Sequence, residues 1–435
     1  MRLFLLASVA LAFPFIAELA HGAATPLALE ARNTLFDARA QDVNGSAAFD
    51  LLHPLEERDA FTDNRGLADD KRLTSTGERP AGAFATTFQI GSGRLFAWQS
   101  KTPHNERDAE SVFINLHGVN RNANTYFRIL NNAWAHARDA GVGSARPNSL
   151  RIAPLFFSTL RDSRAINAST LAWGDSNTWT GGDGSTNPAG SNLSLFSVYD
   201  FFLEKYSDSR NYPRMRTITF LGHGGGAQVV QRYAVLGRDN PAPGRISVRY
   251  VVANPSSMLY FTRDRPVEVD TRSCNWFDDF RYGLANYRSP YRLPGSAAFL
   301  FKRYASRDVR YLVASDDDSS VEGDQLCGGR AAGGPIRHNR SWAYWKYLNL
   351  LSGNSNASIR SLFGDFPALE PGKSNNGGRI PTSSAAHLGQ FRGVSVNHRI
   401  AAVHNTGHSA TAVLESAAGR ALMFQARETL PRQQN

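Results

Sequence analysis

Residues 217–227, TITFLGHGGGA, decide the fold of this chain. The β-branched residues before Gly222 predict a strand, and the amphipathic run 228–236 predicts a helix directly after the glycines. A strand, a tight glycine-rich turn and a helix in this order are the setting of a nucleophile elbow, whose sequence pattern is G-x-S-x-G. Gly224 occupies the position of the serine. The sequence therefore predicts an elbow whose nucleophilic side chain is missing.

Strands and helices alternate on both sides of this turn. Strands are predicted at 84–89, 94–99, 112–116, 150–156, 217–220, 247–253, 309–314 and 399–403, and helices at 125–140, 195–205, 228–236, 297–304, 341–351 and 409–424. This alternation predicts an α/β fold with a doubly wound, mostly parallel sheet that helices cover on both faces. Residues 161–192 are predicted to be a loop, and the aromatic, irregular residues 258–295 an inserted lid-like region. Because ligands of such sheets bind at the carboxyl ends of the strands, the residues that follow the strands are the candidates for a site.

The N-terminal residues have the pattern of a targeting segment. Arg2, an apolar run and small residues near Gly22 predict a secretory signal peptide at 1–22. An uncleaved membrane anchor is the alternative, although the apolar run is short for a membrane span. Residues 23–80 are polar and charged and are interpreted as an N-terminal extension, which leaves 81–435 as the main domain. We therefore expect a secreted, extracellular protein without a stable membrane span.

The cysteines and the sequons are consistent with that location. Cys274 and Cys327 suit one disulfide in an oxidising compartment, with two free buried thiols as the alternative. Candidate glycosylation sites are Asn44, Asn167, Asn192, Asn339 and Asn356. The formal net charge of +10 comes from basic residues, mostly arginines, scattered along the chain. This pattern indicates a solvated basic surface, and we expect no nucleic-acid partner.

The residues after the later strands are those that a serine nucleophile requires. In such a fold the nucleophile is followed along the chain by an acid and then by a histidine. Here Gly224 is followed by the aspartates 316–318 and then by His408. The acid fixes the tautomer of the imidazole, and the imidazole takes the proton of the nucleophile. The acid and the base are therefore predicted to be present.

Backbone N–H groups are predicted to form an oxyanion hole beside Gly224. One donor is expected from Gly225, the residue after the nucleophile position, and the other from Val119 or Asn120 in the turn after the strand 112–116.

From about residue 112 to residue 416 the chain resembles the α/β-hydrolase superfamily of serine hydrolases, in particular its secreted lipase-, esterase- and peptidase-like members. The resemblance is carried by His117-Gly118, Gly222-His223-x-Gly225-Gly226, the aspartates after the strand 309–314 and the turn Gly407-His408. It implies the α/β-hydrolase fold. The register of the strand 309–314 against the family pattern favours Asp317 as the acid, with Asp316 and Asp318 as alternatives. The chain departs from the family at Gly224, so the covalent activity of the family does not carry over.

The same side chains have structural interpretations. His408 could be a helix cap or a core histidine, and the aspartates 316–318 could form a solvated turn or a calcium site. His117 is expected to be structural, and His223 to be an elbow side chain without a required role. His404 is a second choice for the base.

The glycine-rich turn also fits the dinucleotide pattern G-x-G-x-x-A. That pattern requires an acidic residue at the end of the next strand to hold the ribose, whereas the strand 247–253 ends in Asn254-Pro255. A dinucleotide-binding protein is therefore a minor alternative, and we expect no cofactor and no metal.

Two classes of function follow from these residues. The first is a pseudoenzyme that keeps a hydrolase fold for binding a small ester, acyl or peptide-like ligand or a protein partner. The second is a hydrolase of ester or amide bonds in which His408 and Asp317 activate a water molecule; the chain could also be a serine-to-glycine variant of an active hydrolase. Several aromatic residues suggest an apolar cleft under the lid-like region, with plain core packing as the alternative: Trp173, Trp179, Tyr260, Trp276, Phe277, Phe280 and Tyr282.

Overall fold

A computed structural model describes residues 72–174 and 178–434. The predicted signal peptide, most of the predicted N-terminal extension and the sequon at Asn44 lie outside the described residues.

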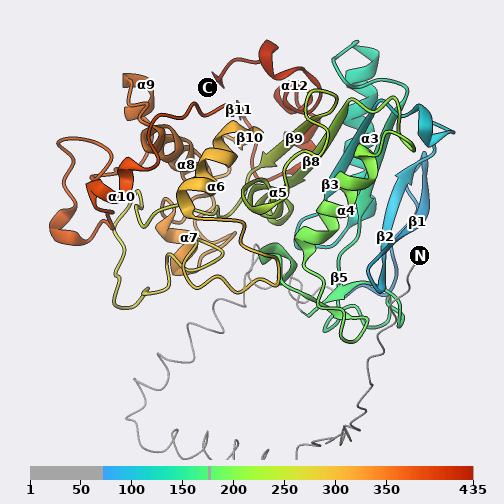
Figure 1. Ribbon diagram of the computed structural model, residues 1–435, viewed down its shortest axis with the longest axis horizontal. Helices are drawn as coiled ribbons and strands as arrows, with labels where there is room; N and C mark the ends of the chain where they lie inside the picture. The colour runs from blue at the N-terminus through green and yellow to red at the C-terminus, as the bar shows by residue number, and fades with distance from the viewer. Residues whose placement is uncertain (1–71, 175–177, 435) are drawn as a thin grey trace, which may run out of the picture. The chain divides into compact units, whose positions relative to one another are not determined.

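The described part of the chain is built around a nine-stranded sheet with the order β1-β2-β4-β3-β8-β9-β10-β11-β12 (Figure 1). Its strands are β1 (Ala83–Ile90), β2 (Gly93–Ser100), β3 (Ser111–Leu116), β4 (Ser149–Pro154), β8 (Thr217–His223), β9 (Ser247–Ala253), β10 (Asp308–Ala314), β11 (Arg399–Val403) and β12 (Gln433–Gln434). β2 pairs antiparallel with both β1 and β4, and every other pairing is parallel. This is the α/β-hydrolase fold, as predicted.

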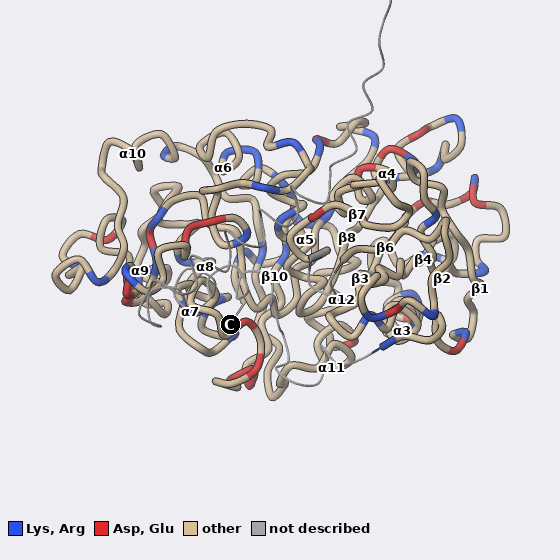
Figure 2. The backbone as a smooth tube through the Cα atoms, turned by 90° about the horizontal axis from the view of Figure 1, so that it is seen from below, with Lys and Arg blue, Asp and Glu red and all other residues tan. Residues whose placement is uncertain are grey.

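Helices cover both faces of this sheet, because the side chains of each buried strand alternate between two apolar layers. The helices are α3 (Ala123–Asp139), α4 (Leu195–Ser207), α5 (Gly225–Leu236), α6 (Ala297–Ser306), α7 (Cys327–Ala331), α8 (Arg337–Ser352), α9 (Ala357–Arg360), α10 (Ala385–Gly389), α11 (Ala410–Leu414) and α12 (Ala417–Phe424). In β8, Ile218 and Phe220 pack with α4, α5, α6 and α8, whereas Leu221 packs with α3, α11 and α12. Figure 2 shows α3, α11 and α12 on one side of the strands and α4, α5 and α6 on the other.

Two predicted segments differ from the structure. The predicted closing helix at 409–424 is two helices, because Ser416 caps α12 by accepting a hydrogen bond from the N–H of Gly419 at 2.8 Å. A Cβ atom on Gly419 would lie 2.3 Å from the carbonyl oxygen of Val413, so the close approach of the two helices requires glycine at this position. The predicted loop 161–192 contains β6 (Ala172–Trp173) and β7 (Ser185–Asn187), which form a small sheet with β5 (Phe157–Ser158).

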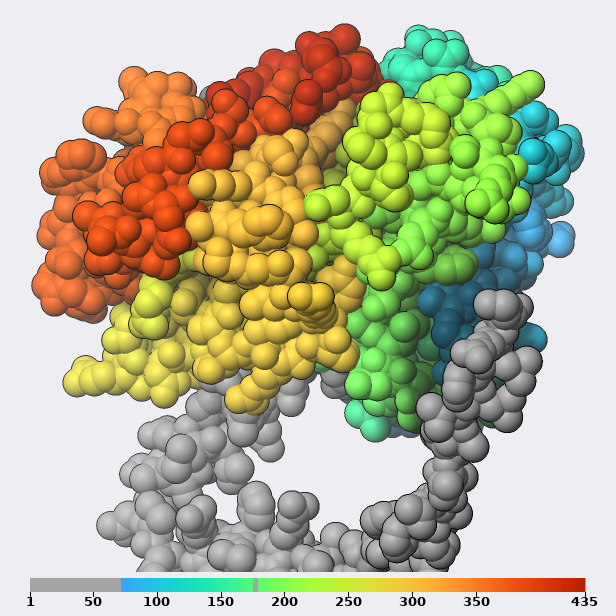
Figure 3. Space-filling view, in the orientation of Figure 1, coloured from blue at the N-terminus to red at the C-terminus, as the bar shows by residue number. Residues whose placement is uncertain are grey.

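The predicted inserted region lies between β9 and α6 and is irregular, as expected. Backbone hydrogen bonds join it to the later segment 353–398: Asp365 donates to the carbonyl of Pro266, and Val269 donates to that of Arg379. Figure 3 shows the two segments, yellow and orange-red, side by side. Within the described residues, the helices are too short or too polar to cross a membrane.

Candidate active site

The turn after β8 has the backbone of an elbow. Gly224 has φ 58° and ψ −119°, in the positive-φ region that side-chain-bearing residues avoid, and it begins α5 as its N-cap. A Cβ atom on Gly222 would lie 2.5 Å from the carbonyl carbon of Gly226, and one on Gly226 would lie 2.5 Å from the carbonyl oxygen of Leu116. These two positions must therefore be glycine for α5 to start so close to β3 and β8.

The acid and base candidates meet at the carboxyl edge of the sheet. Nδ1 of His408, which follows β11, lies 2.9 Å from Oδ2 of Asp317, which follows β10. Asp317 is buried, whereas the flanking Asp316 and Asp318 are exposed. The turn therefore directs only the middle carboxylate inward.

A buried arginine completes this pair. Nε of Arg337 donates to Oδ1 of Asp317 at 2.9 Å, so the two carboxylate oxygens of Asp317 have different partners. The side chains of Arg337 and Asp317 are only 1% and 2% exposed, and Arg337 also lies 3.4 Å from Oε2 of Glu322. The sequence patterns do not point to Arg337, because the helix was expected to begin at residue 341. One available signal was a cation in the first turn of a helix, where the helix dipole disfavours it.

These contacts decide the ionisation of Asp317. Burial raises the pKa of its carboxyl, but the hydrogen bond and charge of His408 and the ion pair with Arg337 outweigh burial and lower the pKa to about 2. Asp317 is thus an anion at neutral pH. It accepts the Nδ1 proton of His408, which leaves Nε2 of His408 as the basic nitrogen.

The turn after β3 faces the elbow across a cavity of about 430 Å³. Val119, Asn120, Gly224, Gly225 and His408 all line this cavity, so the structure brings the predicted oxyanion-hole residues and the base candidate together. Arg121, next to Asn120, has φ 51° and donates from Nε to Oδ2 of Asp162 at 2.8 Å, with both side chains fully buried. This ion pair fixes the end of the turn.

Two further histidines lie under the site. The N–H of Phe156 donates to Nε2 of His117 at 3.0 Å, and Nδ1 of His117 lies 2.8 Å from the carbonyl oxygen of Gly118. Burial lowers the pKa of His117 to about 3, so His117 is neutral and structural. The ring centroid of His223 is 4.3 Å from that of His408, and burial and the proximity of His408 lower the pKa of His223. His404 is exposed.

The aromatic residues proposed for an apolar cleft do not line this cavity. Trp173, Trp179, Trp276 and Phe277 are almost fully buried, so core packing accounts for them. The cavity wall is instead mixed, with Asn122, Thr125, Tyr126, Ile129, Glu322 and Thr411 among its residues. Within the described residues, no cluster of His, Cys, Asp and Glu side chains is arranged to hold a metal ion.

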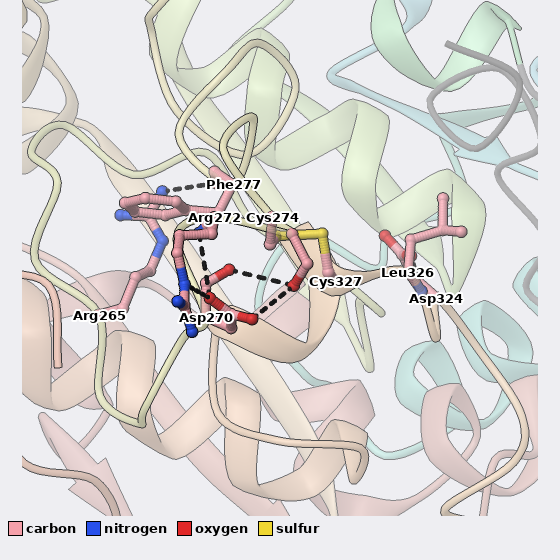
Figure 4. Close-up of a disulfide and its surroundings, with 9 residues drawn as sticks. Arg265, Asp270, Arg272, Cys274, Phe277, Asp324, Leu326 and Cys327 are labelled. Carbon is pink, nitrogen blue, oxygen red and sulfur yellow. Dashed lines mark hydrogen bonds and ion pairs between the residues drawn. A yellow bond between two sulfur atoms is a disulfide. The ribbon is translucent and has the colours of Figure 1, made fainter. Parts of the chain in front are cut away.

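The predicted disulfide Cys274–Cys327 is present and is confirmed (Figure 4). It joins the inserted region to the start of α7, ten residues after Asp317 along the chain. Of the sequons in the described part, Asn167, Asn192 and Asn356 are exposed, whereas Asn339 is half-buried in α8.

Comparisons with known proteins find similarity in structure only. No known family profile and no curated protein matches the sequence. Poly(aspartic acid) hydrolase-1 from Sphingomonas sp. KT-1 is 17% identical, with a TM-score of 0.47 over 80% of this chain and 99% of that chain. A poly(3-hydroxybutyrate) depolymerase from Bordetella parapertussis is 17% identical, with a TM-score of 0.47 over 84% and 96%. An S-formylglutathione hydrolase from Agrobacterium tumefaciens is 12% identical, with a TM-score of 0.36 over 79% and 94%. Similarities this distant say nothing of what this chain binds.

Proposed function

We propose that this chain binds an ester, acyl or peptide-like ligand in the cavity beside Gly224 without forming a covalent acyl intermediate. The observation that carries the proposal is the backbone of Gly224, which has the conformation of an elbow but no side chain. A serine hydrolase forms its acyl-enzyme through the hydroxyl at this position. The chain would thus be a pseudoenzyme or a nucleophile-lacking variant with a hydrolase fold.

The rest of the site supports ligand binding. The cavity volume of about 430 Å³ lies within the range of small-molecule sites. Val119, Asn120 and Gly225 line the cavity, and their backbone N–H groups would hold a carbonyl or carboxylate oxygen of the ligand. The mixed wall suits a ligand with both polar and apolar parts.

Hydrolysis by an activated water is the second candidate, and the intact pair of Asp317 and His408 favours it. A water molecule in the space of the missing hydroxyl would give its proton to Nε2 of His408 and attack the ligand carbonyl. His408 would then return that proton to the alcohol or amine as its bond to the carbonyl carbon breaks. Enzymes that lack triad members but keep an oxyanion hole retain rates about 10³–10⁴ above water, so this activity would be weak.

Secretion and glycosylation are part of the proposal. The disulfide Cys274–Cys327 supports an oxidising location, and the exposed sequons at Asn167, Asn192 and Asn356 are open to modification. A protein partner is the second class of ligand that we propose for a pseudoenzyme.

Ester turnover separates the two candidates. The chain as it stands and its variants His408→Ala and His404→Ala should be assayed with a panel of p-nitrophenyl esters, and ester binding should be followed by calorimetry. Under the proposed function, all three forms bind esters and none turns them over above the buffer rate. Turnover that His408→Ala abolishes, and that His404→Ala at the exposed control position leaves unchanged, would replace the binding function with the water mechanism. Failure of every ester to bind would contradict both.

A further inference from the structure

A second cavity lies at the amino ends of the strands, on the opposite edge of the sheet from Gly224. Its volume is about 1080 Å³, and its wall includes the first residues of β3, β8, β9 and β10. Six arginines line it against four carboxylates: Arg146, Arg216, Arg249, Arg303, Arg307 and Arg427. This cavity is therefore basic, and its wall shares no residue with that of the candidate active site.

Two of these arginines have a buried Nε atom that lacks an acceptor. Nε of Arg249 and Nε of Arg303 are shielded from solvent and find no hydrogen-bond acceptor among the residues that the structure describes. The carboxylate oxygens paired with them, on Asp308 and Asp239, are 3.6 Å and 3.9 Å away, beyond hydrogen-bond distance. A buried charged donor that lacks an acceptor is costly, so the chain's own groups do not fully compensate these two guanidinium charges.

The arginines of this cavity also crowd other cations. Burial, and then the neighbouring Arg307, lowers the pKa of Arg303. Burial, and then Arg310, lowers the pKa of Arg249 to about 9. Figure 2 shows basic positions gathered near α6, which carries Arg303. A bound anion would stabilise the charged form of each of these guanidinium groups.

We propose that this cavity binds a polyvalent oxyanion, a ligand that carries at least two phosphate, sulfate or carboxylate groups. The planar guanidinium presents a fork of N–H donors that matches the oxygens of such groups. Arg303 lines the cavity from the end of α6 and Arg249 from β9, so separate anionic groups have separate partners. Arg307 already donates to the carbonyl of Gly237 and to Asp239, so it contributes its charge. A volume of about 1080 Å³ leaves room for more than one such group. The proposal is independent of what the cavity beside Gly224 binds.

Calorimetric titration of the whole chain with pyrophosphate, in chloride at constant ionic strength, tests this site. We expect saturable binding that Arg303→Gln weakens about tenfold or more, because a charge-assisted hydrogen bond is lost. Asp239→Asn should tighten binding several-fold, because this carboxylate is 70% exposed and competes for Arg303 and Arg307. Arg272→Gln is the matched control, because it removes the same charge at a side chain that is 95% exposed and does not line the cavity.

For the proposal to stand, Arg303→Gln must weaken pyrophosphate binding and Asp239→Asn must tighten it. If Arg303→Gln fails to fold, the direction of Asp239→Asn decides alone. Absence of saturable binding, or an equal loss in Arg272→Gln, would overturn the site. Titrations with citrate and with a disulfate ester then separate the ligand classes: the tightest of the three probes identifies whether phosphate, carboxylate or sulfate groups fit.

Discussion

The turn after β8 and the loop after β10 are built in opposite ways, although both contribute to the candidate active site. At the turn, Gly224 occupies a positive-φ position that glycine adopts without strain, and it offers no reactive atom. In the loop, Asp317 is buried between His408 and Arg337, and its charge is held by both. Removing charged groups from water is expensive, and a buried ion pair is weak evidence of a gain in stability. The chain therefore keeps Asp317, buried at a cost in free energy, beside His408, although the nucleophile that this pair would serve is missing at Gly224.

The largest expected effect on stability comes from breaking the buried ion pair of Arg337 and Asp317. Arg337→Met should lower the free energy of unfolding by about 3–5 kcal/mol, because it leaves the buried carboxylate of Asp317 without its cation. Urea denaturation at pH 7 measures this loss. Arg330→Met is the matched control, because Arg330 is exposed on α7, and it should stay within about 0.5 kcal/mol of the parent. An equal decrease in the free energy of unfolding of both variants would show that the ion pair of Arg337 contributes no more to stability than an exposed arginine does.

Removing the disulfide tests whether the loop after β10 depends on this covalent link to the inserted region. The double variant Cys274→Ser, Cys327→Ser should lower the free energy of unfolding by about 4 kcal/mol, as expected for a closed loop of this length. If the tie also steadies Asp317, ligand binding beside Gly224 weakens as well. A double variant that binds as tightly as the parent would restrict the disulfide to a purely structural role.

Acid pH should destabilise the fold in part through His117, one of the buried histidines. The pKa of His117 is lowered to about 3 in the folded chain, so the unfolded chain, with a pKa near 6.5, binds more protons on acidification. The stability due to its neutral form is complete above about pH 6.5 and is lost as pH falls toward 3, amounting to about 2–3 kcal/mol by pH 4.5. His117→Asn should flatten this slope in denaturation curves from pH 7 to pH 4.5. His404→Asn, at an exposed position, should leave the slope unchanged; a similar flattening in both would contradict the assignment.

The smallest expected effect is the strain at the elbow itself. Gly224→Ser should cost about 1–2 kcal/mol of stability, because a side chain is forced into the backbone at φ 58°. Gly389 offers a matched control, since it lies in α10 without a positive φ and with open space around it, so Gly389→Ser should be nearly neutral. No measurable cost at Gly224 would mean that the turn relaxes out of the elbow conformation.

The sequence was informative where periodicity and turn chemistry act locally. The order of the main strands and helices followed from alternating apolar patterns. Asp317 was favoured over Asp316 and Asp318 only by the register of β10 against the pattern of the family that the chain resembles. The partner Arg337 could not be found in this way, because its contact with Asp317 depends on how α8 packs against the end of β10. For the same reason Trp173 and Trp179 could not be assigned to core or cleft, since aromatic residues suit both. The break between α11 and α12 depends on close helix packing at Gly419, which no periodic pattern reports.

Covalent labelling of Gly224→Ser with a fluorophosphonate tests the central claim most directly. The claim is that the acid, the base and the oxyanion donors are in place and that only the nucleophile is missing. We predict that the serine form is labelled at residue 224, that the chain as it stands is not, and that adding His408→Ala to the serine form reduces labelling by at least about 10³-fold. A serine form that folds, keeps its ligand affinity and still takes no label would contradict the claim.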